Sequence, residues 1–115
     1  MKNKLKLIVN NTNQNKEIFF IKKELQCILN LYARKVSSGD WKDYGLSINK
    51  KEISFDIYQG ASENPIYRIS KNLKPKNKNE RFYVLDKHGN LITRSESIDK
   101  IVNKVEWTKL KLIKK

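Results

Sequence analysis

Apolar residues recur at helical spacing in the first third of the chain. The stripe consists of Ile21, Leu25, Ile28, Leu29, Tyr32 and Val36. These steps of one, three and four residues place the stripe on one face of an α-helix. Gly39 suits the left-handed position after the last turn, and Arg34 and Lys35 complement the negative end of the helix dipole. The pattern predicts a helix over Lys22–Ser38, although no Ser, Thr, Asp or Asn directly precedes it as a cap.

Downstream of this helix, apolar and polar residues alternate, as they do in strands with one buried and one solvated face. Strands are predicted over residues 46–49, 53–58, 66–71, 81–86 and 91–94. The first two form a hairpin, and the last two are joined by a turn in which Gly89 supplies a positive φ. A polar, basic connector over residues 72–80 separates the third and fourth strands.

A second, shorter helix is predicted within Ser95–Lys104, with Ser97 as its N-cap. At the ends of the chain, residues 4–9 alternate Lys with apolar residues and predict an edge strand, residues 10–15 form a polar loop, and residues 106–115 form a basic strand or tail.

Together these elements predict a single α+β domain over residues 1–115, with its core in residues 16–105. One long helix packs on a twisted antiparallel sheet of about four or five strands, followed by a short C-terminal helix. The helical stripe is expected to bury against the apolar positions of the first hairpin, which are Leu46, Ile48, Ile53, Phe55 and Ile57.

The chain is strongly basic, with 25 Lys and Arg against 12 Asp and Glu and a formal net charge of +13. This exceeds the magnitude of about 2–8 that is sufficient to keep a small domain soluble. Such an excess favours polyanionic partners such as nucleic acid, a ribosomal surface or anionic lipid. A compositional origin is the alternative, because the abundance of Lys, Asn and Ile is typical of AT-rich coding DNA; it accounts for Lys in place of Arg better than for the net charge.

Basic residues bracket the connector between the third and fourth strands. The candidate nucleic-acid-binding residues are Arg68, Lys71, Lys74, Lys76, Lys78 and Arg81, with Tyr58 as a surface for base stacking. The alternative is a solvated loop whose lysines keep strands from aggregating. The leading hypothesis is a non-enzymatic module that contacts RNA, DNA or a ribonucleoprotein surface mainly through phosphates.

Trp41, Asp43 and Tyr44 lie at the corner between the helix and the first strand. Aromatic rings at such a corner either lock the helix to the sheet or present a flat surface to a partner. The second hypothesis is therefore a protein-interaction adaptor or oligomerisation domain that uses this corner or an open sheet edge.

Catalytic and metal chemistry have weak support. One Cys and one His, Cys27 and His88, give no metal-ligand spacing, and they form a nucleophilic pair only if the fold brings them together. Asp40, Asp43 and Glu63 flank the first hairpin, so a small enzyme with paired carboxylates is a third hypothesis. We expect no cofactor and no metal.

The compartment is predicted from what the sequence lacks. A single cysteine cannot form an intramolecular disulfide, which suits a reducing compartment. No segment approaches the ~20 apolar residues of a membrane span, and no signal-peptide pattern is present. The sequence predicts a cytoplasmic protein.

Three segments resemble a known family: Glu24–Tyr32 of the helix, Gly39–Tyr44 at the corner, and Ala61–Ile69 leading into the third strand. Their order and spacing, from about Phe20 to Ile101, are similar to those of the small alphaproteobacterial proteins of domain-of-unknown-function family 2794. Relatives favour Arg where this chain has Lys, as at Lys42. The resemblance implies a bacterial cytoplasmic protein and implies no activity.

Overall fold

The computed structural model describes residues 19–60, 64–105 and 107 of the 115-residue chain. Its elements are α3 (Lys22–Ser37), β1 (Asp43–Ile48), β2 (Glu52–Tyr58), β3 (Tyr67–Asn72), the 3₁₀ helix η2 (Lys78–Glu80), β4 (Phe82–Asp86), β5 (Leu91–Ser95) and α4 (Ile98–Lys104). The predictions for residues 4–9, 10–15 and 106–115 lie outside the described residues, apart from Trp107.

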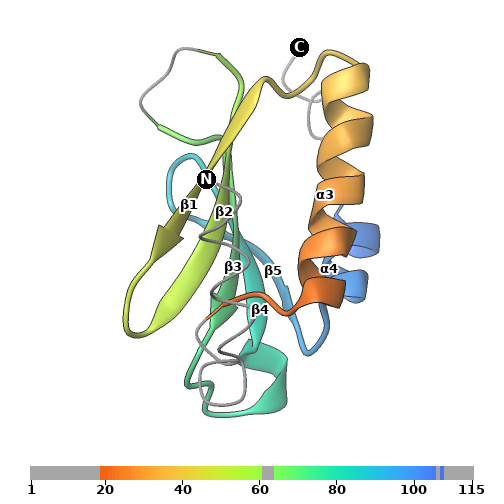
Figure 1. The fold of residues 1–115 in the computed structure, drawn as a ribbon. Coiled ribbons are helices and arrows are strands. Elements are labelled where there is room, and N and C mark those ends of the chain that lie inside the picture. Colours follow the sequence, from red (N-terminus) through yellow and green to blue (C-terminus); the bar gives the residue numbers. More distant parts are fainter. Residues whose placement is uncertain (1–18, 61–63, 106, 108–115) are drawn as a thin grey trace.

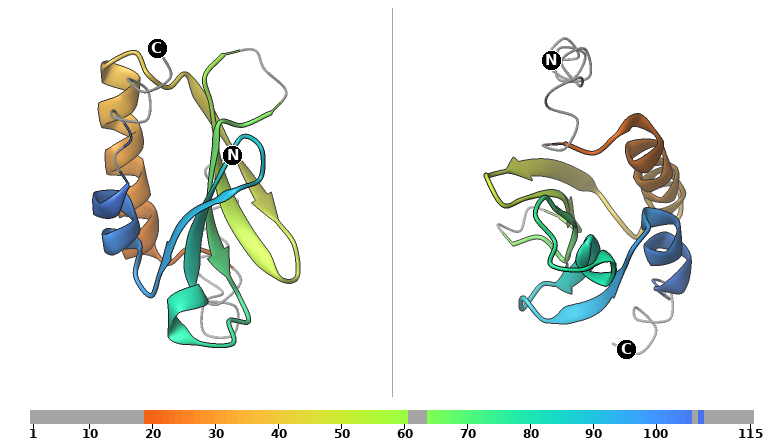
Figure 2. Two further views of the ribbon diagram at one scale, coloured as in Figure 1. Left: turned by 180° about the vertical axis from the view of Figure 1, so that it is seen from behind. Right: turned by 90° about the horizontal axis from the view of Figure 1, so that it is seen from below.

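The strands form one antiparallel sheet in the order β1-β2-β3-β4-β5, with every strand beside its neighbour in sequence. Both α-helices cover the same face of this sheet, as the views from two directions agree (Figures 1 and 2). This confirms the predicted α+β fold, with five strands and a 16-residue first helix.

The first helix begins and ends close to the predicted residues, and its termini show why. At the start, a Glu24 carboxylate oxygen accepts a hydrogen bond from the Ile21 N–H at 2.9 Å, which is half of a capping box and takes the place of the absent polar cap. At the end, Gly39 has φ +85° and the Ser38 N–H donates to the Arg34 carbonyl at 3.1 Å. The predicted N-cap of the second helix, Ser97, is also present, with its side chain accepting from the Lys100 N–H.

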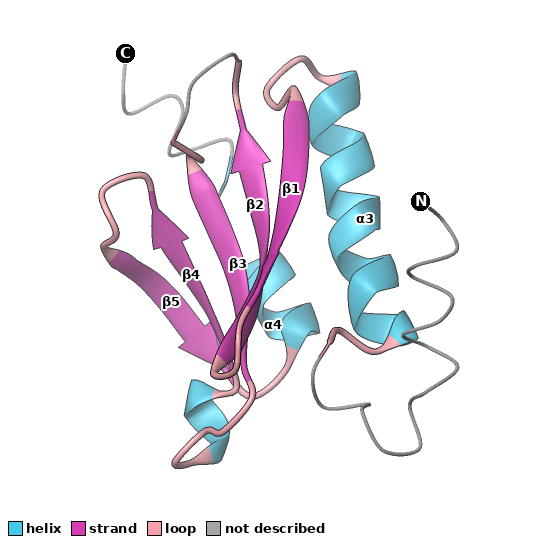
Figure 3. Ribbon diagram, turned by 60° about the vertical axis from the view of Figure 1, so that its left-hand side comes forward, coloured by secondary structure: helices cyan, strands magenta, loops and turns pink. Residues whose placement is uncertain are grey.

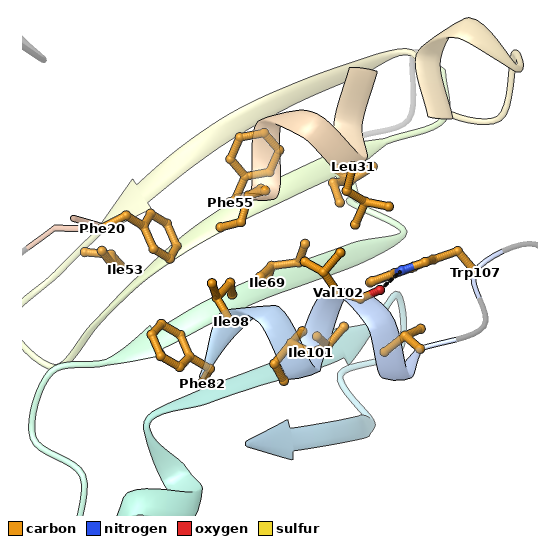
Figure 4. Packing of buried hydrophobic residues seen from close by; sticks show 14 of the residues in the cluster. Phe20, Leu31, Ile53, Phe55, Ile69, Phe82, Ile98, Ile101, Val102 and Trp107 are labelled. Atoms are coloured by element: carbon orange, nitrogen blue, oxygen red, sulfur yellow. Dashed lines mark hydrogen bonds between the residues drawn. The ribbon is translucent and has the colours of Figure 1, made fainter. Parts of the chain in front are cut away.

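The hydrophobic core lies between the helices and the covered face of the sheet (Figure 4). Its buried members include Ile28 and Leu31 of α3, Ile53, Phe55 and Ile57 of β2, Ile69 of β3, Phe82 and Val84 of β4, and Ile98, Ile101 and Val102 of α4. Trp107 joins this core and its indole N–H donates to the Val102 carbonyl at 3.2 Å. The predicted burial of the β2 residues is confirmed.

The predicted burial of β1 is wrong. Leu46 and Ile48 are 42% and 53% exposed, although they face the same side as the core residues of β2. The reason is the position of α3, which lies beside α4, where Cys27 bonds to Asp99, and packs on β2 through Tyr32 and Phe55. α3 reaches β1 at Tyr44, whose ring is 5.1 Å from that of Tyr32, and leaves Leu46 and Ile48 exposed. For the same reason Val36, at one end of the helical stripe, stays exposed.

Candidate nucleic-acid interface

The sheet face turned away from the helices is mostly polar. In the observed register it carries Ser47 of β1, Glu52, Ser54, Asp56 and Tyr58 of β2, Arg68, Ser70 and Asn72 of β3, Tyr83 and the apolar Leu85 of β4, and Arg94 of β5. Alternate residues of a strand point to opposite faces, so the partners paired across neighbouring strands share this side. We call these residues the open face. Tyr58 shares it with Ser54 and Asp56, as predicted.

A buried carboxylate organises one half of the open face. Asp56 is 3% exposed and accepts hydrogen bonds from the Ser47 and Ser54 hydroxyls at 2.6 and 2.7 Å. The Arg68 Nε lies 3.7 Å from the same carboxylate, while the Arg68 side chain is 46% exposed. Because a buried charge needs partners, this arrangement satisfies Asp56 and orients Arg68. The exposed guanidinium still has donors with which to receive an anion.

Tyr83 stands at the centre of the other half. Its hydroxyl donates to the Glu52 carboxylate, and burial together with this hydrogen bond raises the pKa of Tyr83 to about 12. The phenol is therefore a neutral donor held in one place at ordinary pH. Arg94 lies directly opposite on β5, Arg68 lies diagonally across on β3, and Arg81 is two residues earlier in the chain. Two of the four arginines of the chain, Arg68 and Arg94, thus share the sheet face of this tyrosine.

Arg81 lies directly before β4, where its carbonyl accepts the Asn72 N–H at 2.7 Å and continues the β3–β4 pairing by one residue. Its backbone angles, φ −64° and ψ −43°, are helical because Arg81 is the C-cap of η2, so the alternation of the strand does not extend to it. Arg81 therefore lies at the connector end of the open face, whereas the strand register places Arg68 and Arg94 on that face.

The predicted lysines of the connector lie at one end of this face, between β3 and β4, where Figure 1 shows η2 at the end of the sheet. Lys74, Lys76 and Lys78 are all exposed. The backbone that carries them is organised by asparagines: Asn72 accepts from the Lys74 N–H at 2.9 Å, and Asn77 accepts from the Asn79 N–H at 3.1 Å. The connector therefore presents its ammonium groups from a defined turn.

Lys71 is the predicted contact that the structure separates from the others. It follows Tyr67 and Ile69 on the helix-covered side, and it is 3% exposed. Its ammonium lies 2.9 Å from the Glu24 carboxylate and 3.1 Å from the Phe19 carbonyl oxygen. Lys71 thus joins the sheet to the start of α3 and is not accessible to a phosphate. This is a correction to the set predicted from the sequence.

The predicted aromatic corner is divided between core and surface. Trp41 is 3% exposed, with its ring centroid 5.5 Å from that of Trp107 and 6.1 Å from that of Tyr67, so it is a structural residue and not a surface for a partner. Tyr44 is exposed and stacks on Phe55 with a centroid distance of 4.7 Å. Asp43, also exposed, accepts a hydrogen bond from the Tyr44 N–H at 2.8 Å.

The enzymatic hypothesis gains little from the described residues. The Cys27 thiol donates to the Asp99 carboxylate at 3.3 Å; burial, followed by this contact, raises the pKa of Cys27 to about 11, so the nucleophilic thiolate is scarce. His88 lies in the β4–β5 turn, and Glu63 lies outside the described residues. Within the described ranges, no three His, Cys, Asp or Glu side chains are grouped to hold a metal. No helix in that part of the chain has the length and apolarity to cross a membrane.

Sequence reasoning missed Arg94, although the signal was present. The predicted four-residue turn over residues 87–90 implies a hairpin that pairs Tyr83 with Arg94, which is the register observed. The scarcity of arginine in a lysine-rich chain was a second signal. The role of Asp56 had no such signal, because its partner Arg68 is on another strand.

The comparisons place the chain in a family. Neither the curated proteins nor the solved structures include a match to it. One family model, described as "Protein of unknown function (DUF2794)", matches residues 18–102, from just before α3 to the middle of α4. The chain therefore belongs to the DUF2794 family of proteins of unknown function.

Proposed function

We propose that this protein is a non-enzymatic module that binds nucleic acid, free or on a ribonucleoprotein surface, through phosphate contacts along the open face. The observation that supports this most strongly is that Arg68 of β3 and Arg94 of β5 share one sheet face with Tyr83 of β4, with Arg81 directly before β4 at the end of η2. The guanidinium group matches a phosphate with two parallel hydrogen bonds, which a lysine ammonium cannot do.

The connector extends this surface. From the level of Tyr58 to the level of Glu52 the sheet is about 20 Å long at ~3.3 Å per residue, and the connector lysines lie beyond its Glu52 end. A strand of nucleic acid that follows the open face meets the arginines first and the lysines next. These contacts hold the backbone and do not select a sequence.

Two tyrosines add a second type of contact. Tyr58 and Tyr83 are half-buried on the open face, where unpaired bases can stack on rings for about 1–3 kcal/mol each. Duplex DNA offers no unpaired bases, so we expect single strands to bind more tightly than duplexes of the same length.

The first prediction concerns the connector. Replacing Lys74, Lys76 and Lys78 with alanine removes three phosphate contacts, so the slope of log K against log salt concentration should decrease in magnitude by about 2 for a single strand. If the contribution of the three lysines to binding vanishes near 1 M salt, a slope change of about 2 over this tenfold range of salt means roughly 100-fold weaker binding at 0.1 M. Fluorescence anisotropy with a labelled 20-mer RNA or DNA strand measures both quantities.

The matched control removes the same charge from the other layer. Lys23, Lys100 and Lys104 are exposed on the helices, and their triple alanine variant also lowers the net charge by three. It should change the slope by well under 1, because these residues lie on the far side of the sheet. Equal effects of the two triple variants, or an unchanged slope in the connector variant, would reject the open face as the binding surface.

A further inference from the structure

Within the part of the chain that the structure describes, β1 is the edge of the sheet and has backbone groups with no hydrogen-bond partner. In the β1–β2 hairpin the Asn49 N–H donates to the Glu52 carbonyl at 2.9 Å, and the ladder alternates from there. Alternation in an antiparallel pair directs the N–H and C=O groups of Leu46 and Ile48 outward. The Tyr44 N–H, which has the same orientation, is the one that the Asp43 side chain caps. Among residues 19–60, 64–105 and 107, none pairs with these two consecutive outward positions, which can therefore accept an added strand.

An apolar surface borders this edge on the helix side. We call Val36, Tyr44, Leu46 and Ile48, all of them exposed, the β1 flank. The strand and the helix meet here, because the Tyr32 ring of α3 lies 5.1 Å from the Tyr44 ring, and Val36 is one helical turn beyond Tyr32. Figure 3 shows β1 at the edge of the sheet with α3 beside it. Grouped exposed apolar side chains of this kind are typical of interaction sites.

Lysines stand at both ends of the β1 flank. Exposed Lys42 directly precedes β1, and exposed Lys50 follows it in the hairpin turn. Lys22 lies at the same end as Lys50. The ion pair between Glu24 and Lys71 holds the start of α3 near Lys71, and Lys71 is level with Ile48 across the sheet. A bound segment is thus favoured when it has negative charge at its two ends.

Two other occupants are less favoured by the charges. A second copy of the chain carries the same net charge of +13, so self-association through β1 meets long-range repulsion. The chain's own N-terminal residues include Lys2, Lys4 and Lys6, which would add positive charge beside Lys42 and Lys50.

We propose that the β1 edge and flank bind an extended segment of a partner protein, which adds a sixth strand to the sheet. The segment has apolar side chains at alternate positions, which cover the β1 flank, and acidic residues at both ends, which meet the lysines. Backbone hydrogen bonds to Leu46 and Ile48 supply part of the affinity, and the alternate side chains supply the selection. This surface lies on the helix side of the sheet, so the inference does not depend on the nucleic-acid proposal.

The test uses a defined peptide, Glu-Glu-Val-Thr-Val-Thr-Val-Glu-Glu, and the full chain. Hydrogen exchange followed by NMR should show at least tenfold slower exchange of the Leu46 and Ile48 amides at saturating peptide, because each becomes hydrogen-bonded. The same peptide with every Glu replaced by Lys should bind at least tenfold more weakly at low salt.

Two variants separate the backbone contact from the side-chain contact. Leu46→Ala removes apolar surface only, whereas Leu46→Pro also removes the outward N–H at a position where an edge strand tolerates proline. We expect Leu46→Pro to bind the peptide at least fivefold more weakly than Leu46→Ala, with circular dichroism confirming that both fold.

Several results would overturn the proposal. Unchanged exchange at Leu46 and Ile48 with peptide, equal affinity for the two peptides, or equal affinity of the two variants would exclude strand addition of this type. Protection of the same amides before any peptide is added would identify a different occupant: a second copy if protection rises with protein concentration, or residues of the same chain if it does not.

Discussion

Trp41→Ala is expected to lower the free energy of unfolding by about 3–5 kcal/mol, the usual cost of removing a large buried aromatic side chain. Trp41 is 3% exposed and its ring packs edge-on against Trp107, beside Tyr67 and Tyr32. The variant loses this apolar area and leaves a cavity where the end of α3, β3 and the residues after α4 meet. At about 4 °C per kcal/mol for a domain of this size, the melting temperature should fall by roughly 12–20 °C.

The neighbouring residue provides the control for Trp41→Ala. Lys42 is exposed, so Lys42→Ala should change the unfolding free energy by less than about 0.5 kcal/mol. Urea denaturation of both variants measures the difference. A Trp41→Ala protein with the wild-type melting temperature would contradict a core position for this indole and would restore the interpretation of the corner as a binding surface.

Glu24→Ala is expected to destabilise the protein by about 3–5 kcal/mol, because it leaves a buried ammonium without its counter-ion. In the wild type the Lys71 ammonium is 2.9 Å from Glu24 and its other polar contact is the Phe19 carbonyl. Glu24 also accepts the Ile21 N–H at the start of α3, so the variant loses part of the helix cap. Lys71→Met should cost less, about 1.5 kcal/mol or below, since Glu24 is nearer the surface and keeps that acceptor role.

The double variant Glu24→Ala/Lys71→Met tests this asymmetry. Removing the buried charge together with its partner should recover most of the stability lost in Glu24→Ala, leaving a coupling energy of 0.5–3 kcal/mol in a double-mutant cycle. The exposed pair between Lys100 and Glu96, 3.5 Å apart, is the control and should give a coupling of at most about 1 kcal/mol. If the double variant is as unstable as Glu24→Ala alone, an unpaired Lys71 charge is not what destabilises the Glu24→Ala protein.

The elements of this fold were predictable because their periodicity is local. The helical stripe, the alternation of β2 and the glycine at each tight end need only neighbouring residues to define them, and Gly39 and Gly89 do have positive φ. The extent to which α3 covers the sheet was not predictable in this way. It depends on how α3 packs against α4, which brings together residues far apart in sequence, such as Cys27 and Asp99, 72 positions apart. This packing leaves Leu46 exposed.

The candidate site was predictable in part for the same reason. Arg68 and Tyr58 follow the polar alternation of their strands and lie on the open face. Lys71 is two residues after Ile69, so the alternation of the strand already placed it on the covered side. Its partner Glu24 is 47 residues away, and no local pattern points to that contact. Grouping by charge along the chain therefore combined residues from both faces of one strand.

The most direct test of the proposed function is an NMR titration of the full-length protein with a single-stranded RNA 12-mer, in which backbone amide shifts are mapped on the structure. We expect the largest shift changes on the open-face residues of β3, β4 and β5 and on the connector, and we expect them to diminish as salt is raised. Changes concentrated on α3 and α4, or no changes at low salt, would contradict the proposed function.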